Sequence, residues 1–162
     1  MDYDALRDGL AQAIPYNTHL ELEFLELADG SGSVRLPDQE KLRNHVGSQH
    51  AGGLFSAGEA ASGAARPEAA GSAGCAGYGV VGAFAESMSD ITPLARSAEI
   101  EYLKLAKGAI TATATLGGDK DKLIEQLDDE GRVEFPVEVE LTDEDGQAVA
   151  HMSVACHVRK DS

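Results

Sequence analysis

The pattern of apolar and polar positions predicts one buried helix near the middle of the chain. Residues 51–65 are almost entirely small or apolar, and Glu59 is the only charged side chain among them. A helix with so little polar surface must be covered on most of its sides. Gly53, Gly58 and Gly63 each cost this helix about 1 kcal/mol relative to alanine, but they allow another backbone or a ligand to approach closely. We therefore expect the rest of the chain to pack around this helix.

Most of the remaining segments show the period-two alternation that is typical of strands with one buried face. The first two strands are expected to form a hairpin, with a bulge where Phe24 and Leu25 place two apolar residues side by side. Two further helices are expected, one at residues 2–14 that ends at Pro15, and one at residues 119–129. The strands are expected at residues 19–28, 33–36, 78–88, 96–105, 109–116, 132–141 and 148–158.

These elements predict an α+β fold in which a curved antiparallel β-sheet wraps around one central α-helix. The 162 residues fit a single domain, 1–162, in which the N-terminal helix 2–14 precedes a core at residues 15–160. The Asp145–Gly146 pair between the last two strands is a hairpin signal and supports antiparallel pairing there. No internal repeat divides the chain, so we expect one hydrophobic core.

Composition and charge limit the classes of partner. The chain has 13 Lys and Arg residues against 28 Asp and Glu, a net charge of −15, which disfavours binding to nucleic acid or to an anionic membrane. No stretch approaches the roughly 18 apolar residues of a membrane span, and the acidic N-terminus lacks a signal pattern. We therefore expect a soluble, cytoplasmic protein in which Cys75 and Cys156 stay reduced. His45 and His50 are too isolated to indicate a metal site, and no cofactor is expected.

The expected helix and its start contain groups suited to splitting an acyl bond. Backbone N–H groups of Ala51, Gly52 and Gly53 would be unpaired at the helix start, where they would stabilise a developing oxyanion. The alternative is that the two glycines serve only close packing. Glu59 would act as a general base or as an attacking carboxylate, because a carboxylate in such an apolar run needs a reason. The alternative is a structural Glu59 that pairs with Arg66 or with a lysine.

Two side chains in the polar turn before the helix are further candidates. Asn44 would orient a water molecule or a carbonyl group, or it would cap the loop. His50 would take part in catalysis, or it would cap the helix. Nine residues at 1.5 Å each separate His50 from Glu59 by about 13 Å along a helix, so one chain does not easily bring both into one site. A twofold dimer can place Glu59 of one chain against Asn44, His50 and Gly52 of the other.

The same segment resembles the signature of hotdog-fold acyl-CoA thioesterases of the phenylacetyl-CoA thioesterase (PaaI)-like branch. In that family an Asn stands six residues before a His, a Gly-Gly pair follows the His, and an acid lies nine residues after it. Asn44, His50, Gly52–Gly53 and Glu59 keep these spacings. The resemblance implies a hotdog fold, hydrolysis of an acyl-CoA thioester, and a homodimer or a dimer of dimers. Two departures are Ala51, where the family usually has Gly, and Glu59, where this branch commonly has Asp.

The resemblance extends over roughly residues 15–158. The acyl-CoA substrate that it implies carries phosphate groups, so this acidic protein would need a local basic patch to bind it. Lys104 is the first choice for the nucleotide end of coenzyme A and Lys107 the second, and the alternative is that both are ordinary surface lysines. Coenzyme A would enter only as part of the substrate. The main rival function is a non-catalytic hotdog domain that binds acyl-CoA or another acyl ligand, because a fold does not determine a function.

Overall fold

The computed structural model of the protein describes residues 14–28, 30–63 and 91–160. These residues form a six-stranded sheet with the order β1-β2-β4-β5-β6-β3, and all neighbouring strands are antiparallel. The strands are β1 (Glu23–Ala28), β2 (Ser31–Leu36), β3 (Ile91–Tyr102), β4 (Ile110–Leu116), β5 (Arg132–Thr142) and β6 (Ala148–Lys160). The helices are α2 (Pro15–His19), α3 (Ala51–Ser62) and α4 (Lys120–Glu130), with a 3-10 turn η1 (Glu40–Leu42).

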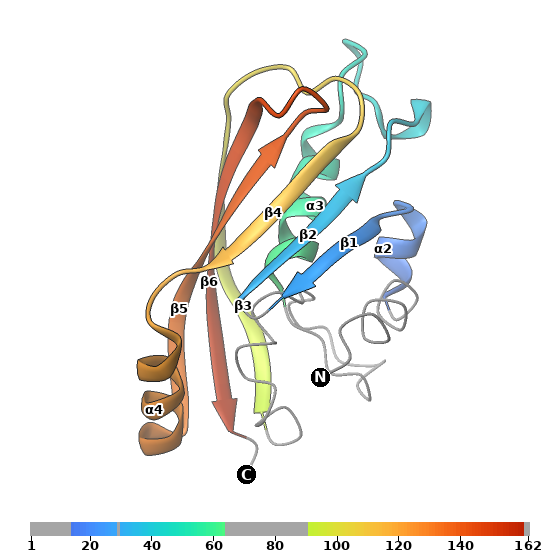
Figure 1. Ribbon diagram of the computed structural model, residues 1–162. Helices are drawn as coiled ribbons and strands as arrows, with labels where there is room; N and C mark the ends of the chain where they lie inside the picture. The colour runs from blue at the N-terminus through green and yellow to red at the C-terminus, as the bar shows by residue number, and fades with distance from the viewer. Residues whose placement is uncertain (1–13, 29, 64–90, 161–162) are drawn as a thin grey trace.

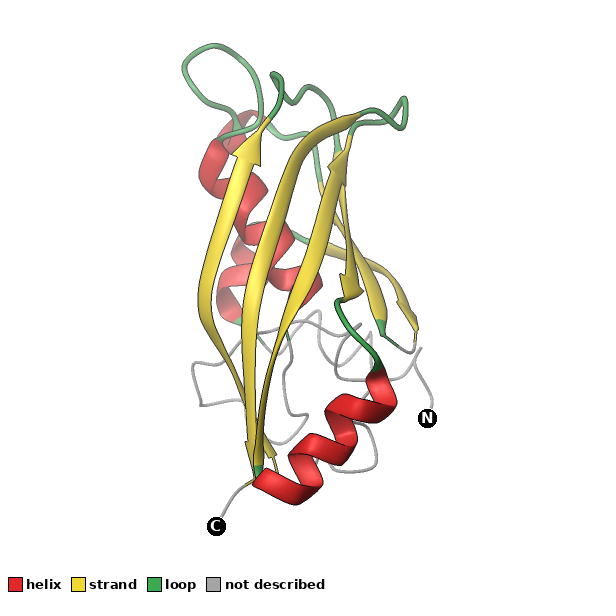
Figure 2. Cartoon of the chain, turned by 90° about the vertical axis from the view of Figure 1, so that its left-hand side faces the viewer, coloured by secondary structure: helices red, strands yellow, loops and turns green. Residues whose placement is uncertain are grey.

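Helix α3 lies against the concave face of the sheet, and the strands curve around it (Figure 1 and Figure 2). It contacts β2, β4, β5 and β6, which are the four inner strands of the sheet. The alternation along β5 places every second side chain in the core and the others in solvent. The predicted α+β arrangement, an antiparallel sheet around one helix, is therefore confirmed. The core residues with the least exposure include Leu36, Ile110, Leu141, Met152 and Val154 from the sheet and Ala57 and Ala60 from α3.

Gly58 is the glycine of α3 at which an added side chain would meet the sheet most closely. A Cβ atom at this position would lie 2.6 Å from the sulfur of Met152, 3.7 Å from Leu141 and 3.8 Å from Val139. Real Cβ atoms essentially never come within 3.0 Å of another heavy atom. The glycine is therefore present because the sheet leaves no room for a side chain, as its place in an apolar helix predicted.

The N-terminal part of the described chain differs from the prediction. Pro15 was expected to end a helix, and this is wrong, because Pro15 begins the short helix α2. Proline suits the first helical position, since its φ is already helical and its missing N–H would have no partner there. Residues 15–19 are consequently helical and β1 begins at Glu23, later than predicted. The bulge is confirmed by a register shift between Phe24 and Glu26. The predicted helix 2–14 lies almost wholly outside the described residues.

The C-terminal half agrees more closely with the prediction. Helix α4 is capped by Asp119, whose carboxylate accepts the N–H groups of Asp121 and Lys122. The β5–β6 hairpin turns at Gly146, which has a φ of 76°. β3 begins and ends earlier than predicted, at Ile91 and Tyr102. The predicted strand 78–88 lies outside the described residues. None of the described helices has the length and apolar character needed to cross a membrane.

Replacing Gly58 with alanine tests this close packing. Alanine would gain about 1 kcal/mol of helix propensity, whereas overpacking a well-filled core costs about 1–3 kcal/mol. We expect the steric cost to be the larger, because the methyl group would meet Met152 in a fully enclosed site. Gly58→Ala should therefore lower the free energy of unfolding by about 1–2 kcal/mol, measured by urea denaturation.

Met152→Ala provides the matched partner for this test. On its own it should destabilise the protein by leaving a cavity, but in combination with Gly58→Ala the added methyl group should occupy part of that space. The double variant should then be more stable than the sum of the two single effects predicts. Strict additivity, or a Gly58→Ala protein more stable than the wild type, would contradict the contact.

Candidate functional site

The side chain of His50 caps the start of α3. This residue is the N-cap, with φ −68° and ψ 138°, and its Nδ1 atom accepts the N–H of Gly52 at 2.9 Å. Its own carbonyl accepts the N–H groups of Gly53 at 2.9 Å and Leu54 at 3.1 Å. A Cβ atom at Gly52 would lie 3.1 Å from Nδ1, so a side chain there would press on the imidazole. His50 thus caps the helix, which is one of the two roles the sequence left open.

The three N–H groups proposed from the sequence as an oxyanion hole differ in their hydrogen bonding. Those of Gly52 and Gly53 are engaged by the His50 side chain and the His50 carbonyl, respectively. The N–H of Ala51 has no acceptor within the described part of the chain. Ala51 and Gly52 are both exposed, and so is the His50 ring. A ligand oxygen can therefore reach the Ala51 N–H directly, and it can reach the Gly52 N–H if the imidazole rotates away.

Asn44 shapes the turn that leads into this helix. Its side-chain oxygen accepts the N–H groups of Val46 at 3.0 Å and Ser48 at 3.1 Å, and its Nδ2 donates to the Ser48 hydroxyl at 2.8 Å. The Ser48 carbonyl in turn accepts the Asn44 N–H at 2.8 Å. These bonds all lie within residues 44–48, so the geometry gives Asn44 the loop-capping role. A contact between Asn44 and a substrate stays a prediction.

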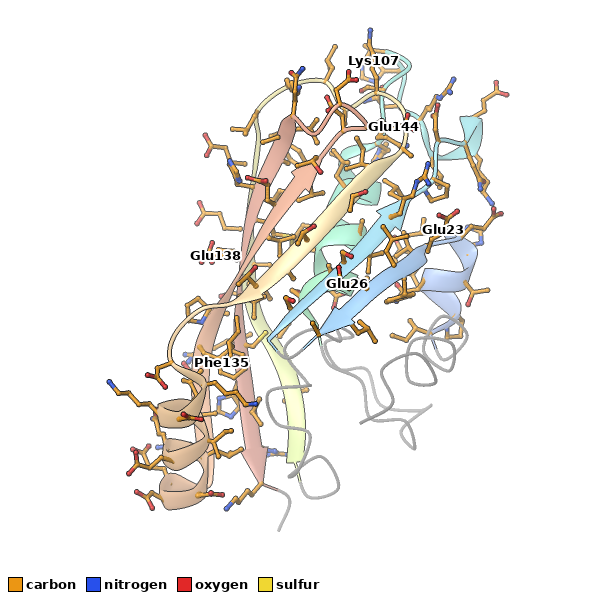
Figure 3. The ribbon with its side chains drawn as sticks, in the orientation of Figure 1. Glu23, Glu26, Lys107, Phe135, Glu138 and Glu144 are labelled. Atoms are coloured by element: carbon orange, nitrogen blue, oxygen red, sulfur yellow. The ribbon has the colours of Figure 1, made fainter. Side chains whose placement is uncertain are left out.

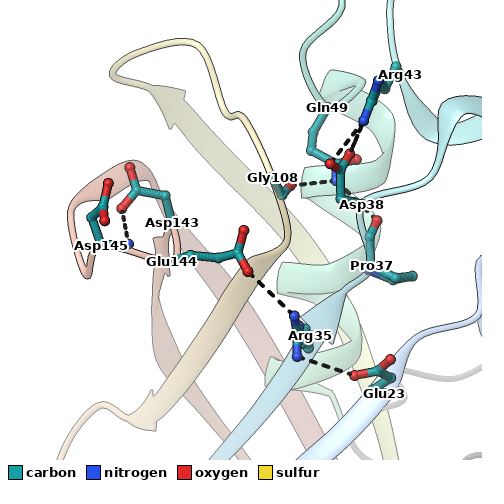
Figure 4. Close-up of polar contacts among 10 residues, drawn as sticks. All are labelled: Glu23, Arg35, Pro37, Asp38, Arg43, Gln49, Gly108, Asp143, Glu144 and Asp145. Carbon is teal, nitrogen blue, oxygen red and sulfur yellow. Dashed lines mark hydrogen bonds and ion pairs between the residues drawn. The ribbon is translucent and has the colours of Figure 1, made fainter.

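Gln49 ties this turn to the loop between β3 and β4. Its side-chain Nε2 donates to the carbonyls of Pro37 at 3.1 Å and Gly108 at 2.8 Å (Figure 4). Its backbone N–H donates to the Ala106 carbonyl at 2.8 Å. The side chain is buried, and its Oε1 atom has no hydrogen-bond partner among the described residues. Because both acceptors are carbonyls, the amide cannot be turned around without losing both bonds. The buried amide therefore holds the two loops together beside the start of α3.

Tyr102 makes a contact with the start of α3 that the sequence did not reveal. It is the last residue of β3, and its hydroxyl donates to the Ala51 carbonyl at 3.1 Å. Burial raises the pKa of this phenol. The sequence shows Tyr102 only as one position of an alternating strand, and no local pattern connects it with residue 51. Only the pairing of β3 with β6 brings the end of β3 to the start of α3.

Glu59 lies two turns further along α3 than the candidate N–H groups. Its side chain is partly buried, whereas Gly58, Ala60 and Ala61 on either side of it are buried. Its carbonyl accepts the N–H of Gly63 at 2.9 Å. α3 is one uninterrupted helix from Ala51 to Ser62, so Glu59 and the helix start cannot fold back on one another. The structure therefore places the candidate carboxylate and the candidate oxyanion donors apart within one chain.

The two candidate lysines have different surroundings. Lys104 Nζ lies 3.1 Å from the Asp143 carboxylate and 2.7 Å from the Gln147 side-chain oxygen. The backbone N–H of Gln147 and then Lys104 hold the pKa of Asp143 below its usual range. Lys107 is exposed and extends from the β3–β4 loop (Figure 3), and no hydrogen bond or ion pair joins its side chain to other described residues. Lys104 is thus partly neutralised by an acid, and Lys107 is not.

Other sites in the described residues offer less. No group of three or more His, Cys, Asp or Glu side chains there is placed to hold a metal ion. A hollow of about 570 Å³ on the sheet is lined by Thr113, Thr115, Glu138, Glu140 and His151 among others. A second, of about 380 Å³, lies where α4 meets β5 and β6. Neither hollow includes a residue that the sequence proposed for the site.

Solved structures of known proteins share this fold. A protein of Pseudomonas aeruginosa described as a probable thioesterase is 22% identical, with a TM-score of 0.74, and the match covers 99% of this chain and 97% of that one. The Escherichia coli PaaI protein from the phenylacetic acid degradation operon is 16% identical, with a TM-score of 0.60 and coverages of 99% and 91%. The chain therefore has the hotdog fold that the resemblance predicted.

Two further matches are variants of one Staphylococcus aureus protein, described in one case as a thioesterase enzyme. The first carries alanine in place of a glutamine and is 17% identical to this chain, with a TM-score of 0.66 and coverages of 90% and 99%. The second carries alanine in place of a glutamate further along, and it is 16% identical, with a TM-score of 0.62 and coverages of 88% and 97%.

The family comparison covers almost the whole sequence. No curated protein matches it. Residues 4–74 and 78–158 match a family described as a domain of unknown function, DUF4442. The match includes the turn before α3, the whole of α3 and all strands of the sheet except the last two residues of β6. The chain is therefore a member of the DUF4442 family and has the fold of the hotdog thioesterases.

Proposed function

We propose that this protein hydrolyses the thioester of an acyl-CoA at a site formed between two copies of the chain. The observation that carries the proposal is the start of α3, where Ala51 is exposed and its N–H has no acceptor among the described residues. The fold is one that a probable thioesterase shares. In this proposal one copy supplies the N–H groups and its partner supplies Glu59. The dimer, the carboxylate and the acyl-CoA substrate are all parts of the proposal that the experiments below address.

The proposed chemistry follows from the two halves of the site. The thioester carbonyl oxygen accepts the Ala51 N–H, and the Gly52 N–H joins when His50 releases it, so negative charge develops at the positive end of α3. As a general base, Glu59 takes a proton from a water molecule that attacks the carbonyl carbon. The C–S bond then breaks, and the products are a carboxylic acid and coenzyme A. As a nucleophile, Glu59 would attack first and water would hydrolyse the resulting anhydride.

The edge strand β3 supports the dimer part of the proposal. β3 ends the sheet, and no described strand pairs with its outer side. It is 12 residues long, and the side chains of Ala95, Ser97, Ala98 and Glu99 are exposed. An exposed edge of this length invites pairing with another strand. Antiparallel pairing of β3 with its twofold copy would give hydrogen-bond partners to the backbone groups of both edge strands. It would also bring the two α3 helices into one assembly.

The sequence spacing of the S. aureus variants supports the choice of residues. The glutamine and the glutamate replaced in that protein have the same separation in sequence as Asn44 and Glu59. Asn44 and the replaced glutamine both carry a side-chain amide, and Glu59 has the same side chain as the replaced glutamate. This favours the turn before α3 and the carboxylate on α3 as the two halves of the proposed site.

One observation favours the rival function, a domain that binds an acyl ligand without hydrolysing it. Apart from the Ala51 N–H, the polar groups at the helix start are already paired, because Asn44 bonds within its own turn and His50 accepts the Gly52 N–H. In a binding domain these bonds would simply persist when the ligand arrives. In a hydrolase at least the bond from Gly52 to His50 would have to open for two N–H donors to act together.

Glu59→Gln separates these functions. Glutamine keeps the shape of the side chain but cannot accept a proton from water or attack as a carboxylate. We expect kcat for acyl-CoA hydrolysis to fall by about 10²–10⁴-fold, with an unchanged fold, dimer and affinity for coenzyme A. Steady-state kinetics, sedimentation and calorimetric titration provide the three readouts. A structural Glu59 predicts the reverse outcome, with lower stability and a preserved rate per folded molecule.

Mixed dimers test whether the site is shared. Glu59→Gln chains are combined with Asn44→Ala chains, whose altered turn disables their own helix start. Each homodimer should be inactive. In a shared-site mixed dimer, one of the two sites regains an intact turn from one chain and an intact Glu59 from the other, so activity should return in part. If confirmed heterodimers stay inactive, or if the wild type is a stable monomer in solution, the interface site is ruled out.

Lys104→Ala tests the contact with the nucleotide end of the substrate. A phosphate contact remote from the reacting carbonyl contributes equally to ground-state and transition-state binding, so KM should rise while kcat changes little. Asp143→Asn is the matched opposite change, because it removes the acid that neutralises Lys104. It should lower KM for acyl-CoA. If acyl-pantetheine, which lacks the nucleotide, responds to either substitution as strongly as acyl-CoA does, Lys104 does not bind the phosphates.

The pKa of Asp143 provides a check that does not depend on activity. A carboxyl with a lowered pKa in the folded state stabilises the protein above its unfolded pKa, and this contribution is lost as the pH falls through the folded pKa. We expect the carboxyl ¹³C titration of Asp143 to have its midpoint below the ordinary value of about 3.9. Lys104→Ala should raise that midpoint only in part, because the Gln147 N–H is the larger cause. Lys107→Ala should leave it unchanged, and an equal effect of both substitutions would contradict the ion pair.

A further inference from the structure

The phenol of Tyr102 makes a contact whose position suggests more than packing. Its hydroxyl donates to the Ala51 carbonyl at 3.1 Å, yet 46% of the residue is exposed, so burial alone does not explain its placement. The carbonyl of a residue in the first turn of a helix already accepts an N–H from four residues further along. Tyr102 therefore adds a second hydrogen-bond donor to the Ala51 carbonyl oxygen, which already accepts a helical N–H. The contact lies where the start of α3 meets the end of β3.

The Ala51 carbonyl and the Gly52 N–H belong to the same peptide group. The N–H side of this group donates to His50 Nδ1 at 2.9 Å, and the carbonyl side accepts from Tyr102. A donor on the carbonyl draws electron density from the amide and makes the N–H a stronger donor. It also fixes the rotation of the peptide plane, because the phenol is anchored on the sheet by the pairing of Tyr102 with Ala150.

We propose that Tyr102 is a positioning residue that orients and polarises the Ala51–Gly52 peptide so that its N–H serves as a second oxyanion donor. The proposal rests on the proposed function, because the donor acts only when a substrate carbonyl replaces the His50 imidazole. Tyr102 itself does not touch the reacting atoms. Since burial raises the pKa of the phenol, the hydroxyl stays protonated and able to donate at neutral pH.

The placement of Tyr102 also connects the two halves of the proposed assembly. β3 is the edge strand that we propose pairs with its copy in the partner, and Tyr102 is its last residue. A hydrogen bond from this residue to the first turn of α3 ties the orientation of the helix start to the edge of the sheet. No other described side chain donates a hydrogen bond to the Ala51 carbonyl, so this link depends on one hydroxyl group.

Tyr102→Phe removes the hydroxyl and keeps the ring. We expect kcat for acyl-CoA to fall by about five- to tenfold, as the loss of one hydrogen bond predicts, with KM within about twofold of the wild type. The ¹H and ¹⁵N amide resonances of Gly52 should shift, because the donor on the other side of its peptide has gone. Tyr16→Phe is the matched control, since its hydroxyl accepts from Ser56 at 3.3 Å, and Ser56 donates to the Gly52 carbonyl at 2.7 Å, which belongs to the Gly52–Gly53 peptide and not to the Ala51–Gly52 peptide. It should change neither kcat nor the Gly52 resonance.

Each outcome decides the proposal. A fall in kcat together with a shifted Gly52 resonance in Tyr102→Phe, and neither in Tyr16→Phe, supports it. An unmoved Gly52 resonance, or equal effects of both substitutions, overturns it, even if kcat falls. If the wild-type protein hydrolyses no acyl-CoA, the proposed function fails, and the resonance alone then decides whether Tyr102 orients the peptide. If Tyr102→Phe folds poorly, 3-fluorotyrosine at position 102 supplies the same test, because a more acidic phenol should shift the resonance in the opposite direction.

Discussion

The close packing of α3 against the sheet is the constraint on which the rest of the structure depends. A helix with this much small apolar surface is stable only when strands cover it, and four strands do so. At Gly58 the approach is so close that no side chain fits between the helix and Met152. The axis of α3 is therefore fixed relative to the strands, and the positions of its two ends follow from that.

The fixed helix separates the two groups that the proposed hydrolysis needs. The N–H donors lie at its start, where the turn at residues 44–48, the β3–β4 loop and the β5–β6 hairpin meet (Figure 1). Glu59 lies eight residues after Ala51, about 12 Å further along the same helix. A single chain therefore holds half of each proposed site, and the open edge of β3 is where a second copy would complete both halves.

The sequence predicted the elements whose signals are local. Alternation placed β5 and β6, the Asp145–Gly146 pair placed their hairpin, and a run of small residues placed α3. Its errors lie where a second signal competed. Pro15 suits the start of a helix as well as the residue after one, and only the fold around it decides between them. The site followed the same rule, because the capping roles of His50 and Asn44 depend on neighbours in the sequence, whereas the contact of Tyr102 with Ala51 depends on strand pairing across 51 residues.

Charge is the remaining constraint on any substrate that carries phosphate groups. The protein has an excess of 15 negative charges, and acids already compete for some of the cations near the proposed site, although Lys107 has no such partner among the described residues. Lys104 already shares its charge with Asp143, and Arg35 lies between Glu23 and Glu144 (Figure 4). A phosphate would have to displace a carboxylate from Lys104. Selectivity would then come from the difference between these two anions rather than from net attraction.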